Sequence, residues 1–185
     1  MTTATKLFTI GHSNRTLAEF FAILHNHGVG QLIDVRSMPQ SQRYPAYNRN
    51  SLSLACEDEK IAYGWLGHEL GGRRSEKPGS RHCALTHSSF RGYADHMSNR
   101  LFVEGINRLT ALARSQSVAV MCAERNPCQC HRSMIADYLS LHNWQITHLL
   151  TLQQSEPHTL NPLARNVNSS PVYDLLNEEQ LNLRF

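Results

Sequence analysis

The sequence contains no long hydrophobic run. The first apolar stretch after Met1 is only Leu7 to Ile10, which is too short for the core of a signal peptide or for a membrane span. We therefore expect no membrane association, and the cytoplasm is the expected compartment. The chain also shows no internal repeat and no low-complexity segment, which excludes a repeat protein.

Cysteine is scarce, and its count is odd. The 185 residues include five cysteines, at positions 56, 83, 122, 128 and 130. An odd number of thiols in a chain without an export signal argues against a disulfide framework. Reduced thiols or metal ligands are the expected states.

Strong charge of either sign is missing as well. The formal net charge is +3, and charged residues make up 18% of the chain. This balance permits an anionic ligand, but it lacks the dense basic cluster typical of a nucleic-acid footprint. A hydrophobic content of 41% in 185 residues predicts one domain over residues 1–185 with a full core. Residues 151–185 are expected to form a C-terminal extension packed on it.

Short apolar runs alternate with stretches of helical periodicity. Strands are predicted over residues 7–10, 31–35, 61–66, 118–121 and 144–150. Helices are predicted after Thr16, which with Glu19 forms a capping box, and over 51–60, 90–97, 99–113 and 133–141. This alternation predicts an α/β fold: a mainly parallel sheet covered by helices on both faces, with Rossmann-like or flavodoxin-like layering.

Three segments do not follow the alternation. Residues 68–91 form a long irregular region of the kind that often acts as a lid or binding loop. Residues 153–170 are polar and are expected to be irregular. Residues 172–185 are predicted to be a closing helix, with Tyr173, Leu176 and Leu183 toward the body.

Polar residues follow the predicted strands at the points where they end. In a parallel sheet these loops meet at one edge, where ligands bind. The residues concerned are His12, Ser13 and Asn14 after the first strand, Asp34 and Arg36 after the second, Arg73 and Arg74 after the third, and Cys122, Glu124, Cys130, His131 and Arg132 after the fourth. This convergence predicts a functional site.

Cys122 and Glu124 are the main candidates for chemistry. A thiol before a helix N-terminus favours the thiolate, although Cys122 could equally be a small core residue. Glu124 is a candidate general acid or base, metal ligand or nucleophile, and its alternative role is to pair with Arg132 or Arg36. Asp34 is a second candidate for proton transfer.

The other edge residues are candidates for holding a substrate. Arg36, Arg73 and Arg132 would bind an anion through their two-pronged guanidinium groups, and internal carboxylates are their alternative partners. Arg74 belongs to the same group, and a solvated loop is its alternative. The remaining candidates are His12 as a proton carrier and, as binding residues, Ser13, Asn14, Cys130 and His131.

The sequence also suggests a metal site without defining one. Cys128, Cys130 and His131 form a Cys-x-Cys-His pattern, which departs from the usual zinc spacing. A second thin cluster could supply further ligands: His82, Cys83 and His87. No metal ligand is assigned on this basis, and zinc or iron are the ions to consider.

Five motifs occur in a fixed order along the chain. They are Thr9-Ile-Gly-His-Ser-Asn14, Leu32-Ile-Asp-Val-Arg-Ser-Met-Pro39, Leu70-Gly-Gly-Arg-Arg74, Phe90-Arg-Gly-Tyr-Ala94, and Met121-Cys-Ala-Glu124 with Cys130-His-Arg132. Together they resemble the DUF488 family, from about Thr9 to His148. The resemblance implies a single α/β domain and leaves the reaction open. Cys128 departs from the pattern. A weaker, local similarity to rhodanese-like domains rests on Leu32–Arg36 and Cys122.

Three functions are compatible with these residues. The leading hypothesis is an enzyme that acts on a phosphorylated or nucleotide-like small molecule, or on a nucleic-acid end, with Cys122 as nucleophile or ligand. The second is rhodanese-like sulfur transfer through Cys122. The third is a non-catalytic binding module that is stabilised by a metal or associates with nucleic acid. The sequence does not set an oligomeric state.

Overall fold

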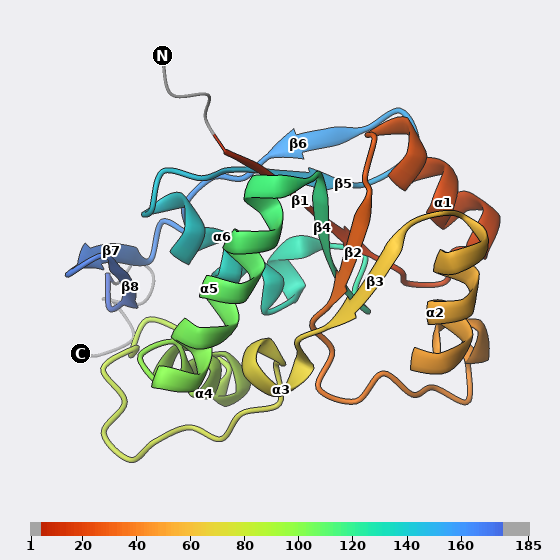
Figure 1. The fold of residues 1–185 in the computed structure, drawn as a ribbon. Helices are drawn as coiled ribbons and strands as arrows, with labels where there is room; N and C mark the ends of the chain where they lie inside the picture. Colours follow the sequence, from red (N-terminus) through yellow and green to blue (C-terminus); the bar gives the residue numbers. More distant parts are fainter. Residues whose placement is uncertain (1–4, 176–185) are drawn as a thin grey trace.

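A six-stranded sheet forms the centre of the computed structural model, which describes residues 5–175 (Figure 1). Its strands lie in the order β3-β2-β4-β1-β5-β6. The first five are parallel to one another, and β6 is antiparallel to β5. Their bounds are β1 (Lys6–Gly11), β2 (Gln31–Asp34), β3 (Ala62–Trp65), β4 (Val118–Cys122), β5 (Gln145–Leu149) and β6 (Ser155–Pro157). The predicted α/β class is confirmed.

Helices cover both faces of this sheet (Figure 1). They are α1 (Leu17–Asn26), α2 (Arg49–Asp58), α3 (Gly67–Leu70), α4 (Ser88–His96), α5 (Arg100–Ser115) and α6 (Arg132–Ser140), with 3-10 turns η1 (Pro45–Tyr47) and η2 (Pro127–Gln129). The residues of α1 and α2 pack into one core cluster, and those of α4, α5 and α6 into the other. None of these helices in residues 5–175 is long and apolar enough to cross a membrane.

The central strands explain why two cores form. All five residues of β4 are buried, and they point alternately to the two faces. Val120 belongs to the cluster under α5 and α6, whereas Ala119 and Met121 belong to the cluster under α1 and α2. A strand that is covered on both sides has no polar face, which is why its sequence is continuously apolar.

The capping box predicted for the first helix is present. The Thr16 side chain accepts a hydrogen bond from the Glu19 amide at 3.2 Å, and the Glu19 carboxylate accepts one from the Thr16 amide at 2.8 Å. Gly28, with φ of 61°, adopts the left-handed conformation that commonly ends a helix. This anchors the helix that follows the first loop of the sheet edge.

The prediction for the C-terminal region is wrong in two respects. Residues 153–170 are not simply irregular, because they contain β6, strand β7 (Ala164–Val167) and the start of β8 (Ser170–Tyr173). Asn168 and Ser169 both have positive φ, as the two-residue turn of a tight hairpin requires. Val172 and Tyr173 therefore lie in a strand rather than a helix, and Leu176 and Leu183 fall outside the described residues. Tyr173 is fully buried against the body, as expected.

Candidate functional site

The loops after β1 and β4 are tied together at Cys122. β4 lies between β1 and β2, and Cys122 ends it opposite Gly11. The amide of His12 donates to the Cys122 carbonyl at 2.9 Å, and that of Ser13 donates to the Ala123 carbonyl at 2.7 Å. The carboxyl ends of β1 and β4 therefore lie side by side, as we expected from the polar residues that follow these strands.

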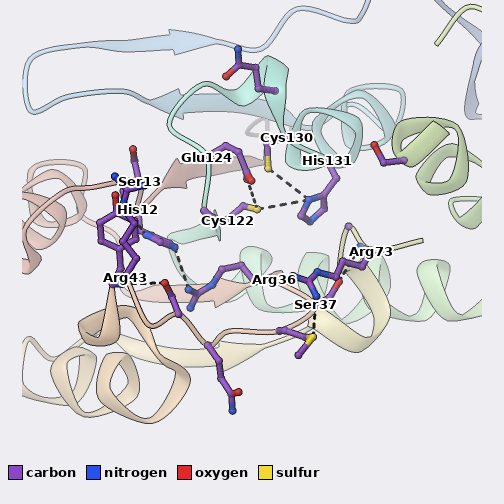
Figure 2. A pocket seen from close by; sticks show the side chains of 18 of the residues that line it. His12, Ser13, Arg36, Ser37, Arg43, Arg73, Cys122, Glu124, Cys130 and His131 are labelled. Carbon is purple, nitrogen blue, oxygen red and sulfur yellow. Dashed lines mark hydrogen bonds between the residues drawn. The ribbon is translucent and has the colours of Figure 1, made fainter. Parts of the chain in front are cut away.

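A cavity of about 640 Å³ opens at this edge (Figure 2). His12, Ser13 and Arg36 form part of its wall, with the segment after β2 and residues 72–73. Phe90 at the start of α4 closes another side. Figure 2 shows Cys122, Glu124, Cys130 and His131 gathered on one side of this space.

The reactive group consists of two thiols, one imidazole and one carboxyl. Cys122 Sγ lies 3.1 Å from Glu124 Oε2 and 3.8 Å from His131 Nδ1. Cys130 Sγ lies 3.7 Å from the same imidazole nitrogen. Cys122 and Cys130 are only 4% and 2% exposed, and both line the cavity. The geometry confirms that these four predicted residues come together.

The two thiols have opposite electrostatic character. A hydrogen bond from Cys130 lowers the pKa of Cys122 well below its usual value, and His131 and Glu124 lower it further, although burial opposes the shift. Burial, and then the hydrogen bond to Cys122, raises the pKa of Cys130 well above the usual value. Cys122 is therefore the thiol of the pair that ionises more readily, and Cys130 is the hydrogen-bond donor to its thiolate form.

The imidazole and the carboxyl respond to that thiolate. Burial opposes the charged form of His131, but the negative charge of Cys122 raises the pKa of the imidazole overall. Loss of hydration, followed by the charge of Cys122, raises the pKa of Glu124. The Glu124 carboxyl therefore holds its proton more firmly than an ordinary glutamate, which suits it to exchange a proton as a general acid or base, and it remains accessible from the cavity.

His131 is held in place from three sides. Its Nε2 lies 3.2 Å from the Val35 carbonyl, and its ring lies 5.0 Å from the ring of Tyr93. Gly72 packs against the imidazole so closely that an added Cβ would come within 2.5 Å of Nδ1. These contacts keep Nδ1 directed at the two sulfur atoms.

Arg36, in the cavity wall, forms a buried pair with Asp34, which lies behind it. The Arg36 guanidinium binds the Asp34 carboxylate at 2.6 Å and the Tyr47 carbonyl at 2.7 Å. Asp34 is fully buried and also accepts from the Tyr63 hydroxyl at 2.8 Å. The alternative internal pairing is thus the one observed, and Asp34 does not line the cavity.

His12 completes this wall. Its Nε2 lies 3.2 Å from Arg36 Nη1, and its Nδ1 lies 3.0 Å from the Ser13 carbonyl. Burial, and then the charge of Arg36, lowers the pKa of His12 to about 4. The ring is therefore neutral near pH 7, and both of its nitrogens are engaged. Its role as a proton carrier stays a prediction.

Three predicted binding residues lie outside the cavity lining. Arg132 is 1% exposed and donates to the backbone carbonyls of Glu124 and Arg125, so its guanidinium braces the loop from inside. Arg74 likewise donates to backbone carbonyls of its own segment. The Asn14 side chain accepts from Arg125 at 3.2 Å. Glu124 pairs with neither Arg132 nor Arg36 through its carboxylate.

Arg73 and Arg43 stand at the cavity rim. Both are exposed and line the cavity. Arg73 was predicted from its place after the third strand, and its only described side-chain contact is with the Met38 sulfur. Arg43 was missed because it lies in the irregular segment after β2, ten or so residues from any strand end. The concentration of arginine and tyrosine in that segment was the available signal.

In the structure, the potential metal ligands form a different group from the one that the sequence suggests. Among the described residues, one cluster of potential ligands is present: Cys122, Cys130 and His131, whose ligand atoms lie within 4.8 Å of one another. Cys128 is exposed and does not take part. His82, Cys83 and His87 do not join it either. The actual cluster therefore combines the strand-end cysteine with the second loop cysteine.

The sequence matches the family model of DUF488, a domain of unknown function, over residues 16–139. The chain belongs to the DUF488 family. The matched residues include four of the five motifs and exclude only the one that precedes Thr16. Searches of curated proteins and of solved structures found no match to the chain.

The weaker similarity to rhodanese-like domains has no support. The comparisons identify only the DUF488 family. In the loop after Cys122, the amides of Cys128 and Cys130 bond to Asn126 and Pro127 of the same loop. Those amides are therefore not available to cradle an anion around the Cys122 sulfur.

Proposed function

We propose that this protein is an enzyme that acts on a small phosphorylated or nucleotide-like substrate, or on a nucleic-acid end, bound in the cavity at the carboxyl edge. One observation carries the proposal. Two thiols, an imidazole and a carboxyl meet in a cavity whose rim holds two arginines, Arg43 and Arg73. Perturbed ionisable groups that converge in a cavity beside cationic side chains are the pattern expected of an active site.

The rim is suited to an anionic group. Within residues 5–175, neither Arg43 nor Arg73 forms an ion pair with a carboxylate. Each can therefore donate to phosphate oxygens without breaking an existing pair. Arg36 differs, because its charge is already balanced by Asp34. We assign substrate binding to the rim arginines and a positioning role to Arg36.

Two aromatic rings in the cavity lining offer faces on which a flat group could pack. Tyr44 and Phe90 both line it, and the Tyr44 ring lies 6.1 Å from that of His12. A base or sugar ring could pack on these faces while its phosphate meets the arginines. The combination favours a nucleotide-like substrate over a simple inorganic anion.

Glu124 is the residue that would move a proton. Its carboxyl faces the cavity beside Cys122 and makes no ion pair among the described residues. Cys122 is the adjacent nucleophile or ligand. Because the carboxylate of Glu124 forms no ion pair within residues 5–175 and its described hydrogen bond is with the Cys122 thiol inside the site, its chemistry can be removed with little effect on the fold.

The test replaces Glu124 by Gln. Wild-type protein is assayed against a panel of phosphomonoesters, nucleotides and phosphorylated oligonucleotides. Glu124→Gln should lower turnover by about 100-fold or more, because general acid–base catalysis contributes at least that much. The melting temperature should stay nearly unchanged. Glu104→Gln, on the exposed side of α5, is the matched control and should retain full activity.

Two results would count against the proposal. If wild-type protein turns over no member of the panel, the substrate class is wrong. If Glu124→Gln turns over substrate as fast as wild type, the site is not catalytic.

Sulfur transfer through Cys122 is a second candidate, favoured by the neighbouring Cys130 thiol. The Cys122 thiolate would attack the outer sulfur of thiosulfate, forming a persulfide and releasing sulfite. Mass measurement after thiosulfate treatment should then show one added sulfur on wild type and none on Cys122→Ser. An unmodified Cys122 would eliminate this candidate.

A further inference from the structure

The Cys122–Cys130–His131 cluster has the dimensions of a metal site. The imidazole Nδ1 lies 3.8 Å from one sulfur and 3.7 Å from the other, and all three atoms lie within 4.8 Å of one another. Ligands about 2.0–2.3 Å from a tetrahedral zinc ion are separated by roughly 3.3–3.8 Å. The thiols and the ring could thus receive an ion with small side-chain adjustments.

His131 is oriented as metal-binding histidines are. Its Nε2 lies 3.2 Å from the Val35 carbonyl, which can only accept a hydrogen bond. In the neutral ring, the form that binds a metal, the proton therefore resides on Nε2, and the lone pair of Nδ1 points at Cys122 and Cys130. A backbone carbonyl that holds the far nitrogen of the ring is the usual outer partner of a metal ligand.

The donor set selects the class of ion. Two sulfurs and one imidazole nitrogen are soft or borderline ligands, which suit zinc and related transition metals. Magnesium and calcium prefer oxygen ligands and would gain little here. No lysine or arginine side chain contacts either sulfur within the described part of the chain.

We infer that Cys122, Cys130 and His131 bind one divalent zinc-class ion whose fourth position opens into the cavity. All three residues line the cavity, so a water molecule or a substrate atom can reach that position. Three protein ligands with one open position are characteristic of catalytic rather than structural zinc sites. The binding of the ion stands by itself, and its catalytic role rests on the proposed function.

Glu124 would act beside the ion rather than hold it. Its Oε2 lies 3.1 Å from Cys122 Sγ, on the cavity side of the cluster. There it can accept a proton from a water molecule at the fourth position. Glu124→Gln should therefore bind the ion as wild type does.

The same loop provides a matched control for the ligands. Cys128 lies two residues before Cys130, but it is exposed and outside the cluster. Cys128→Ser tests whether any thiol in this loop can act as a ligand to the ion. Cys122→Ser, Cys130→Ser and His131→Gln each remove one proposed ligand.

The experiment titrates reduced, chelator-treated protein with Co²⁺ and then displaces it with Zn²⁺. Wild type and Cys128→Ser should each bind one equivalent and show thiolate-to-cobalt charge-transfer absorption. Each ligand variant should bind more weakly by over about 100-fold, because outer partners alone are worth 10–100-fold. Circular dichroism of each variant checks that it is folded, and the three ligand variants serve as checks on one another.

Several outcomes would overturn the inference. Reduced wild type that binds no Co²⁺ would do so, as would Cys122→Ser that binds it as tightly as wild type. A Cys128→Ser loss equal to that of Cys130→Ser would show nonspecific binding by loop thiols.

The experiments can contradict the proposed function and the ion site independently of each other. A Co²⁺ spectrum that no nucleotide or phosphate perturbs, in a protein that turns over no substrate, supports the ion and counts against the proposed function. Turnover by metal-free protein supports the function and overturns the catalytic ion.

Discussion

Two buried polar clusters lie at or beside β1, and they differ in whether their polar groups have hydrogen-bond partners within the protein. One is the cavity cluster of Cys122, Cys130 and His131. The other, which we call the internal relay, contains Thr9, His148, His158, Asp137 and Tyr173. In the relay, Thr9 Oγ1 lies 2.6 Å from His148 Nδ1, and His148 Nε2 lies 3.0 Å from His158 Nδ1. His158 Nε2 and the Tyr173 hydroxyl then bind the two oxygens of Asp137 at 2.9 Å and 2.7 Å.

The relay borders a smaller cavity of about 400 Å³, yet its ring nitrogens and carboxylate oxygens are all engaged. In the cavity cluster, two sulfurs share one imidazole nitrogen at longer distances. Burial alone therefore does not mark a functional site. Full internal pairing indicates a structural role, whereas groups that face one another across an open cavity have capacity left for a ligand.

The largest expected effect comes from breaking the relay. Asp137 is 1% exposed and accepts bonds from His158, the Asn161 amide and Tyr173. Asp137→Ala should lower the free energy of unfolding by about 3–5 kcal/mol, because its buried partners lose their acceptor. Urea denaturation measures this. Asp174→Ala, which removes an exposed ion pair, is the control and should change stability little. A loss below about 1 kcal/mol for Asp137→Ala would contradict a structural relay.

Next in size is a steric change at the cavity cluster. Gly72→Ala would place a Cβ 2.5 Å from His131 Nδ1 and force the ring to move. Turnover and Co²⁺ affinity should each fall by about 100-fold, because small displacements of reacting groups are costly. Gly30→Ala is the control, since its nearest neighbour would lie 3.7 Å away. Equal behaviour of the two variants would show that the position of His131 does not matter.

The relay should also make stability depend on pH. Burial, and then the charges of His158 and Arg132, lowers the pKa of His148 from 6.5 to about 3. The unfolded chain therefore takes up this proton below pH 6.5 while the folded protein does not. The stabilisation that His148 contributes by staying uncharged in the folded protein is fully present above pH 6.5. It is lost as the pH drops toward 3, by up to about 1.4 kcal/mol per pH unit.

Urea denaturation between pH 7.5 and pH 5, values chosen to span roughly the ordinary histidine pKa, measures this dependence. His148→Gln should be less stable at neutral pH and should show a shallower slope. An unchanged slope would mean that other histidines, such as buried His82 and His96, dominate the acid response.

The smallest expected effects are at the rim. Arg43→Ala and Arg73→Ala should each weaken binding of a phosphorylated or nucleotide ligand by about three- to tenfold, since an exposed guanidinium contributes modestly to anion binding. Stability should not change, because both side chains are exposed and form no described ion pair. Isothermal titration measures the affinities, and Arg165→Ala is a distant control. Unchanged affinity in both rim variants would place the ligand elsewhere.

Much of the edge was predictable because strand ends can be read from apolar runs. The β4 run, followed by Cys122 and Glu124, placed those residues correctly, and the Thr16 capping box located α1. The roles of the arginines could not be predicted from the sequence. Arg36, Arg73 and Arg132 look alike in sequence, but only Arg73 is left free at the cavity rim. Partners far apart in the chain determine which guanidinium is already satisfied.

The hairpin of β7 and β8 was missed for a related reason. Residues 153–170 carry no clear alternation, and the turn at Asn168 and Ser169 is visible only as two positive φ angles. Tyr173 belongs to that hairpin, and its buried hydroxyl donates to Asp137 in α6, which is far away in the sequence. Contacts of this kind outweigh local propensity.

By itself the sequence determined the α/β class, the family and the edge of the sheet where polar residues gather. These follow from periodicity and from the rule that parallel strands point their loops one way. Tertiary structure decided which residues act together. It left Cys128 outside the cluster of potential metal ligands and placed Cys122 in it, although Cys122 is six residues further from His131 along the chain. The reason is that β4 fixes Cys122 at the cavity floor, while the η2 turn directs Cys128 to solvent.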